Sequence, residues 1–131
     1  MNATIDHLGI AVRSLDDALK FYRDQLGLTV SLRETVEQEK VNVAMLPAGE
    51  PRIELLEPSA SDSVIAKFIE KRGEGLHHVA VKVPDLSATV ERLKAGGARL
   101  LNDPRPGAGG HLYVFVHPSS TGGVLLELIQ E

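Results

Sequence analysis

Residues 76–83 read Leu-His-His-Val-Ala-Val-Lys-Val, an apolar run typical of a β-strand with two histidines near its start. Residues 5–12, Ile-Asp-His-Leu-Gly-Ile-Ala-Val, repeat this pattern. When His7 is aligned with His78 (78 − 7 = 71), the apolar positions of the strand and of the following helix coincide. A strand carrying a histidine, followed by an amphipathic helix, therefore occurs twice. An internal repeat of this kind decides the fold.

The hydrophobic periodicity predicts the element order βαβββ in each half of the chain. The first half predicts a helix that starts at the capping residue Ser14 and stops at Gly27, with strands at 4–13, 28–35, 40–47 and 52–57. The second half predicts a helix at 86–96, a loop at 102–110 and strands at 76–83, 98–103, 111–117 and 123–130. Between the halves, a helix at about 62–72 is expected to start at Ser61 or Asp62 and to bury Val64, Ile65 and Phe68.

These elements predict an α+β fold in which two fused βαβββ modules form an eight-stranded mixed sheet. The modules cover about 1–60 and 75–131, and the short helix at 62–72 links them. No linker separates them, so residues 1–131 are expected to form a single domain.

Composition excludes several classes of protein. Hydrophobic residues make up 43% of the chain and charged residues 24%, and no apolar run approaches the roughly 20 residues of a membrane helix. A strand pattern begins near the first residue, so no signal peptide is expected. Without a long apolar run, no membrane partner is expected either. The net charge of −4 and 4% aromatic content argue against nucleic-acid binding. The absence of cysteine excludes thiolate ligands and favours a cytoplasmic location.

Four polar residues lie within otherwise apolar predicted strands. Glu54 and Glu127 are related by an offset (127 − 54 = 73) close to the one that relates His7 to His78. Either glutamate alone is explained by a side chain that points outward to solvent. The repetition with the histidines instead favours two imidazoles and two carboxylates around a divalent ion.

The other histidines fit the pattern less well. His77 must point to the opposite face of the strand from His78, so only one of the pair can be a ligand, and the repeat selects His78. His111 and His117 lie outside the repeat. His117 precedes a proline at a strand end, where it either contacts a substrate or caps the strand.

At these residues the chain resembles the vicinal oxygen chelate superfamily and, within it, the methylmalonyl-CoA epimerase family. The segments IDHLGIAV, FYRDQLG, IELLEP, GEGLHHVAVKV, LLNDPRPGAGG and FVHPSSTGGVLLEL carry the resemblance over nearly the whole length. The resemblance implies a paired βαβββ fold cupped around a divalent metal held by His7, Glu54, His78 and Glu127. Co²⁺ is the expected ion, with Mn²⁺, Ni²⁺, Fe²⁺ and Zn²⁺ as alternatives.

The implied activity is an isomerase reaction that interconverts (R)- and (S)-methylmalonyl-CoA by removal and return of the α-proton. Glu127 is expected to be a catalytic acid/base, and Ser119, Ser120, Gly122 and His117 are expected to bind the substrate. Some relatives carry a second catalytic glutamate at the position of Val43. Glu39 is the first candidate to replace that glutamate, because it shares the strand face of Val43 if the strand is regular. Glu37 and a water molecule are the other candidates.

Apolar strands at the edges of such modules favour a homodimer. The resemblance implies a small CoA thioester as the substrate. The alternatives are a glyoxalase I-like isomerase or an extradiol-type dioxygenase on the same scaffold, and a non-catalytic module that binds a small molecule without metal. The four candidate ligands argue against the module, and the segment from His117 to Gly123 argues against the glyoxalase.

Overall fold

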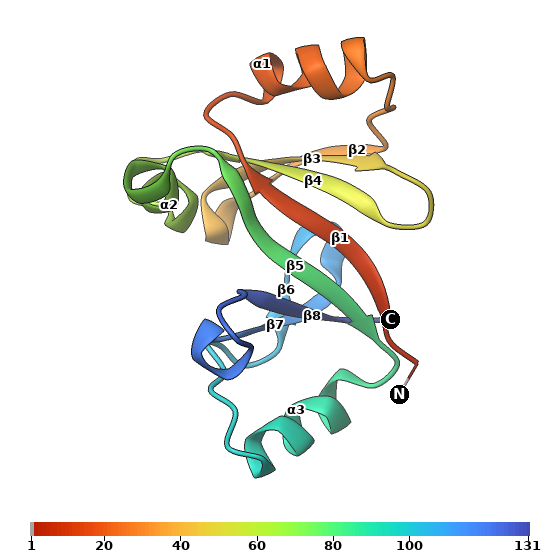
Figure 1. Ribbon diagram of the computed structural model, residues 1–131, viewed down its shortest axis with the longest axis vertical. Helices are drawn as coiled ribbons and strands as arrows, with labels where there is room; N and C mark the ends of the chain where they lie inside the picture. The colour runs from red at the N-terminus through yellow and green to blue at the C-terminus, as the bar shows by residue number, and fades with distance from the viewer. Residues whose placement is uncertain (1) are drawn as a thin grey trace. The chain divides into compact units, whose positions relative to one another are not determined.

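One mixed sheet of eight strands, in the order β2-β3-β4-β1-β5-β8-β7-β6, carries the fold of this computed structural model, which describes residues 2–131 (Figure 1). The strands are β1 (Thr4–Ala11), β2 (Leu32–Val36), β3 (Val41–Pro47), β4 (Arg52–Pro58), β5 (Gly75–Val83), β6 (Arg105–Pro106), β7 (Leu112–Val116) and β8 (Leu126–Gln130). The helices are α1 (Leu15–Leu19), α2 (Val64–Arg72) and α3 (Leu86–Ala95). The predicted α+β class and eight-stranded mixed sheet are confirmed.

The sheet is mixed because β5 and β8 run parallel, whereas β2–β3, β3–β4, β6–β7 and β7–β8 are antiparallel pairs. The chain divides into two units, one of described residues up to His7 together with His78–Glu131, the other of Leu8–His77. In the described part of the chain, no helix combines the length and apolar character needed to cross a membrane.

Each unit has its own apolar core, and the two cores are built from equivalent residues. Every member of one core has a counterpart in the other, at or near the offset that relates His7 to His78. The pairs are Val12/Val83, Leu15/Leu86, Leu19/Val90, Ala44/Val114, Leu46/Val116 and Leu55/Leu128. The repeat that the two histidine strands predict therefore extends through the packing of both units.

The repeat also governs how the first helix of each unit begins. Glu57 Oε2 accepts a hydrogen bond from the backbone N–H of Leu15 at 2.8 Å. Gln130, the equivalent residue at the end of the second unit, accepts one through Oε1 from the N–H of Leu86 at 2.7 Å. These N–H groups have no partner within their own helices, so a side chain from the last strand of each unit satisfies them.

The first helix differs from the prediction in its second half. Ser14 caps it as expected, since its side chain accepts a hydrogen bond from the N–H of Asp17 at 3.1 Å. After Leu19 the helix continues as a π-helix over Lys20–Gln25 before Gly27 adopts a positive φ. The wider π turn rotates Leu26 off the buried face, and this residue is 54% exposed.

Helix α2 lies close to its predicted position, but its start and its buried face differ. Ser63 is the cap, because its hydroxyl accepts a hydrogen bond from the N–H of Ala66 at 3.0 Å. The helix therefore begins at Val64, which is 63% exposed, and it buries Ile65 and Ile69. The predicted caps Ser61 and Asp62 were wrong, as was the burial of Val64.

The strands also depart from the prediction at three places. Strand β2 begins at Leu32 rather than residue 28, and β8 begins at Leu126 rather than residue 123. The predicted strand at 98–103 is reduced to a bridge between Leu100 and Val116, and the short strand β6 forms inside the predicted loop.

Asn102 explains the interruption before β6. Its side-chain amide donates to the carbonyl oxygen of Tyr113 at 3.2 Å, and its Oδ1 accepts from the N–H of Phe115 at 2.8 Å. The amide side chain thus takes the place of a strand backbone beside β7, and no continuous strand is needed there.

Leu15 and Leu86 occupy equivalent positions in the two cores, 1% and 2% exposed. Replacing either by alanine is expected to destabilise the protein by about 2–5 kcal/mol, because a large apolar side chain leaves a cavity. If both units form one cooperative domain, as the sequence predicts, urea unfolding followed by circular dichroism and by tyrosine fluorescence gives one coincident transition in each variant. Two transitions, with each substitution shifting only one, would instead show two independently stable units.

Candidate functional site

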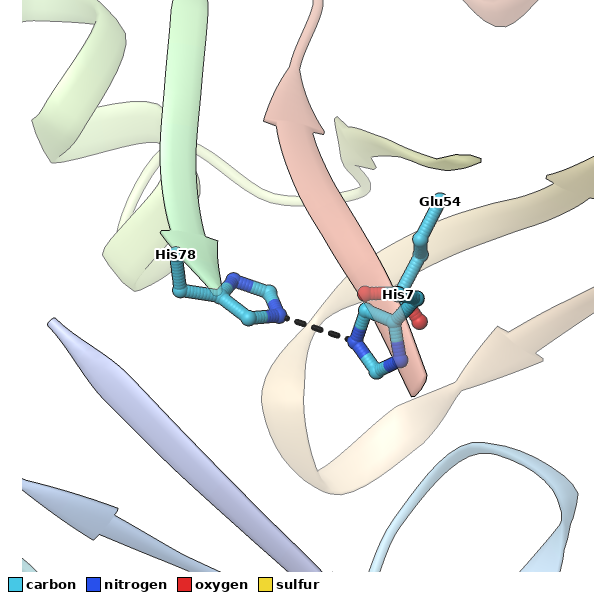
Figure 2. Close-up of side chains that lie close together, drawn as sticks. All are labelled: His7, Glu54 and His78. Carbon is cyan, nitrogen blue, oxygen red and sulfur yellow. Dashed lines mark hydrogen bonds between the residues drawn. The ribbon is translucent and has the colours of Figure 1, made fainter. Parts of the chain in front are cut away.

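His7 and His78 form a buried pair of imidazoles whose rings face each other edge to face (Figure 2). The two side chains come from β1 and β5, and their Nε2 atoms are 3.1 Å apart. His7 and His78 are 2% and 4% exposed, so water does not form hydrogen bonds with their ring nitrogens, and other groups must do so. The structure thus brings together the two histidines that the repeat selects.

Glu127 completes a triangle of ligand-type atoms with the two imidazoles. Its Oε1 lies 3.1 Å from His7 Nε2 and 3.0 Å from His78 Nε2. Glu127 is 9% exposed, on β8 between Leu126 and Leu128. The alternative that this glutamate points outward to solvent is therefore wrong.

Glu54 belongs to a second group of ligand-type atoms that shares the histidine pair. It is 5% exposed on β4, so the outward-pointing alternative is also wrong for Glu54. One ligand atom from each of His7, Glu54 and His78 lies within 4.8 Å of the others (Figure 2). Glu127 also lies close to both histidines, at the distances given above.

The geometry suits a divalent cation. Bonds of about 2.0–2.2 Å to a zinc-like ion place neighbouring ligand atoms roughly 2.8–3.6 Å apart, for angles between octahedral and tetrahedral. The triangle of His7, His78 and Glu127 has sides of 3.0–3.1 Å, within this range. Imidazole nitrogen with carboxylate oxygen is a donor set of first-row divalent ions. These residues could therefore hold a divalent metal ion.

The charge on Glu127 follows from its surroundings. Burial alone would raise the pKa of Glu127, but its hydrogen bonds with His7 and His78 outweigh burial and lower the pKa below the ordinary value of 4.5. Glu127 is consequently ionised at neutral pH. That is the protonation state in which a carboxylate binds a metal or accepts a proton.

His77 points away from this cluster, as strand alternation predicts. Its ring packs edge to face on Phe68 of α2, with ring centroids 5.0 Å apart. In contrast, the ring of His78 packs on Phe115 at 5.4 Å. Phe115 is the cross-strand partner of Glu127, so an aromatic side chain borders the cluster on β7.

The turn after β7 holds the other predicted site residues. His117 Nδ1 accepts a hydrogen bond from the N–H of Ser119 at 3.0 Å, and Ser120 Oγ accepts one from the N–H of Arg99 at 2.9 Å. Gly122 has a positive φ of 76° in this turn. These bonds give His117 and Ser120 a role in building the turn, and their contact with a substrate stays a prediction.

The residues considered as substitutes for a second carboxylate on β3 do not lie on that strand. Glu37 and Glu39 form a 3₁₀ turn before it, so neither lies on the strand face that carries Val43. Val43 is 1% exposed on β3.

Comparison with known proteins identifies the family of this chain. Residues 6–115 match the sequence model of the glyoxalase/bleomycin resistance protein/dioxygenase superfamily. The chain belongs to this superfamily. It is 41% identical to mitochondrial methylmalonyl-CoA epimerase of Mus musculus, over 96% of this chain and 72% of that protein. It is 38% identical to the ethylmalonyl-CoA/methylmalonyl-CoA epimerase of Cereibacter sphaeroides, over 99% of both.

A solved structure shows the same similarity in three dimensions. Streptomyces coelicolor methylmalonyl-CoA epimerase (Q60A), in complex with 2-nitronate-propionyl-CoA, is 39% identical and superposes with a TM-score of 0.92. The superposition covers 97% of this chain and 96% of that one.

Replacing His78 by alanine is expected to weaken Co²⁺ binding on the order of 100-fold or more, since loss of a ligand exceeds the roughly 10–100-fold effect of losing an outer partner. Isothermal titration calorimetry with the metal-free protein measures this loss. His77→Ala is the matched control, because its ring packs on Phe68, and it is expected to bind Co²⁺ as the wild type does. Equal losses in both variants would exclude His78 as a specific ligand.

Proposed function

We propose that this chain is a metal-dependent epimerase that interconverts (R)- and (S)-methylmalonyl-CoA. The observation that carries the proposal is the buried convergence of the Glu127 carboxylate with the imidazoles of His7 and His78. The full-length similarity to proteins named methylmalonyl-CoA epimerase supports the substrate, a CoA thioester. On this proposal the protein acts in the cytoplasm as a homodimer.

His7, Glu54, His78 and Glu127 are the proposed metal ligands, and Co²⁺ is the favoured ion. Mn²⁺, Ni²⁺, Fe²⁺ and Zn²⁺ are compatible with the same nitrogen and oxygen donors. When bound, the ion acts as a Lewis acid toward the oxygens of the substrate and stabilises the charge that develops as the α-proton leaves. The protein contributes the buried surroundings, which strengthen this electrostatic interaction.

Glu127 is the proposed base on one side of the α-carbon. Its low pKa keeps the carboxylate ionised at neutral pH and so ready to accept a proton. The same low pKa makes it a weak base, and the reaction therefore depends on a large increase in the acidity of the substrate carbon. The groups around Ser119, Ser120, Gly122 and His117 are proposed to contact the substrate carboxylate.

Inversion also needs an acid on the other side of the α-carbon, and β2 offers a carboxylate. Burial alternates along this strand: Arg33 and Thr35 are exposed, whereas Leu32 and Glu34 are half-buried and Val36 is buried. Glu34 therefore points to the covered side of the strand, between two apolar neighbours.

The register of the sheet relates Glu34 to Glu54. Glu34 pairs with Val43 of β3, and Val43 pairs with Leu56 of β4. Directly paired residues point to the same face, as do residues two apart in one strand. Glu34 thus shares a sheet face with Glu54, and we assign it as the second proton carrier.

The reaction is tested by solvent exchange. Incubation with Co²⁺ and methylmalonyl-CoA in D₂O is expected to place deuterium at the α-carbon, and removal of the metal by a chelator abolishes the exchange. Glu127→Gln is expected to lower the rate by roughly 10²–10⁴-fold, the usual contribution of a general acid or base. Mass spectrometry of the thioester measures the incorporation.

A metal-loaded wild type that incorporates no deuterium would contradict the proposed function. Faster turnover of a glutathione hemithioacetal than of the CoA ester would point to a glyoxalase I-like isomerase instead.

Glu34→Gln should separate proton exchange from inversion. With one carrier lost, Glu127 still exchanges the α-proton of one epimer with solvent, while interconversion of the epimers slows by about 10²-fold or more. Chiral analysis of the product, together with deuterium incorporation from each pure epimer, measures both rates. Glu37→Gln, an exposed position in the turn after β2, is the matched control and should behave as the wild type. Interconversion at the wild-type rate in Glu34→Gln would remove Glu34 from the mechanism.

A further inference from the structure

Asp6 is a buried carboxylate that the proposed chemistry does not use. It precedes His7 on β1 and is 7% exposed. Its Oδ2 lies 2.7 Å from His7 Nδ1, and its Oδ1 lies 3.8 Å from Lys82 Nζ. Both oxygens of Asp6 thus face polar partners in the same unit as the histidine pair.

This contact determines which nitrogen of His7 carries hydrogen. A carboxylate oxygen only accepts a hydrogen bond, so the short contact requires hydrogen on Nδ1 of His7. Without a metal, Nε2 of His7 can also carry hydrogen and donate it to Glu127; in the neutral imidazole that a metal requires, Nε2 instead presents its lone pair. This Nε2 atom lies 3.1 Å from both His78 Nε2 and Glu127 Oε1.

The burial of Asp6 requires an explanation beyond packing. An ionised carboxylate without partners costs several kcal/mol in an apolar interior, roughly, and a strand that needed only shape would carry an apolar residue there. Lys82 contributes a charge from β5, but its side chain is 39% exposed and its nitrogen is farther away. The closest partner of Asp6 among these contacts is the ring of His7.

The repeat shows that only one of the two histidines, His7, is preceded by a carboxylate. When His7 is aligned with His78, the position equivalent to Asp6 is His77. The ring of His77 packs on Phe68 and faces another element. A carboxylate before the histidine is therefore an addition to His7 and not a requirement of the strand.

We propose that Asp6 is a positioning residue that holds His7 in the Nδ1–H form and so directs its Nε2 lone pair toward a bound divalent cation. The inference rests on the proposed metal site, but not on the identity of the substrate. Carboxylate partners of this kind orient imidazole ligands in metal sites and affect metal affinity.

The tautomer of His7 can be measured in the wild-type protein. Nitrogen-15 NMR of the imidazoles, at a fixed pH at which they are neutral and with Zn²⁺ bound, is expected to show hydrogen on Nδ1 of His7. Spectra of His7→Gln assign the signals. Hydrogen on Nε2 of His7 would overturn the proposal without any change to Asp6.

Substitution of Asp6 tests the consequence for the metal. Asp6→Ala is expected to weaken Co²⁺ binding by about 10–100-fold and to change the visible spectrum of the bound Co²⁺. Asp6→Asn retains an oxygen that accepts from Nδ1, so it should recover most of the affinity. Rescue by asparagine separates positioning of the ring from charge.

Asp85→Ala controls for a loss of stability. Asp85 caps α3 by accepting a hydrogen bond from the N–H of Ala88 at 3.0 Å, so its loss should destabilise the protein and leave Co²⁺ affinity unchanged. Wild-type affinity and spectrum in Asp6→Ala would overturn the role of Asp6. Failure of the wild type to bind any divalent metal would instead overturn the proposed metal site itself.

Discussion

The convergence of His7, His78 and Glu127 within an apolar sheet is the constraint on which the functional argument depends. Three ligand-type atoms lie 3.0–3.1 Å from one another, each from a residue that is at most 9% exposed. Such polar atoms are costly to bury unless protons or a cation are shared among them. His7, His78 and Glu127 all belong to one unit, and the apolar core of that unit packs the strands β5 and β8 that carry His78 and Glu127.

Duplication accounts for how one chain achieves this arrangement. Each unit repeats the same core positions, and each uses the last strand to satisfy the start of its helix, through Glu57 or Gln130. A single histidine and a single glutamate per module are weak signals, since each has an ordinary explanation. Their recurrence at nearly equal offsets along the chain singled out all four from the sequence, and the structure buries all four side chains.

The features that were not predictable depend on individual side chains rather than on periodicity. Asn102 pairs with β7 through its amide, and a hydrophobic pattern cannot distinguish this from a strand. The π turn after Leu19 changes which residues face inward, and the hydrophobic pattern of the sequence does not reveal this wider turn. Asp6 and Glu34 could have been noticed in the sequence, since each is an acid at a position where strand patterns favour apolar residues. What each one faces is shown only by the structure, through the contact of Asp6 with His7 and the strand register of Glu34.

The surroundings of the paired glutamates have diverged more than the glutamates themselves. Glu127 pairs across the sheet with Phe115, and Glu54 pairs with Met45, the residue equivalent to Phe115 in the repeat. The Phe115 ring packs edge to face on His78, whereas Met45 offers a flexible thioether. The two glutamates therefore keep equivalent places in the repeat while their neighbours differ. On the proposed function, equivalent carboxylates suit a single cation, and unlike neighbours suit a substrate whose thioester and carboxylate groups differ in size, charge and polarity.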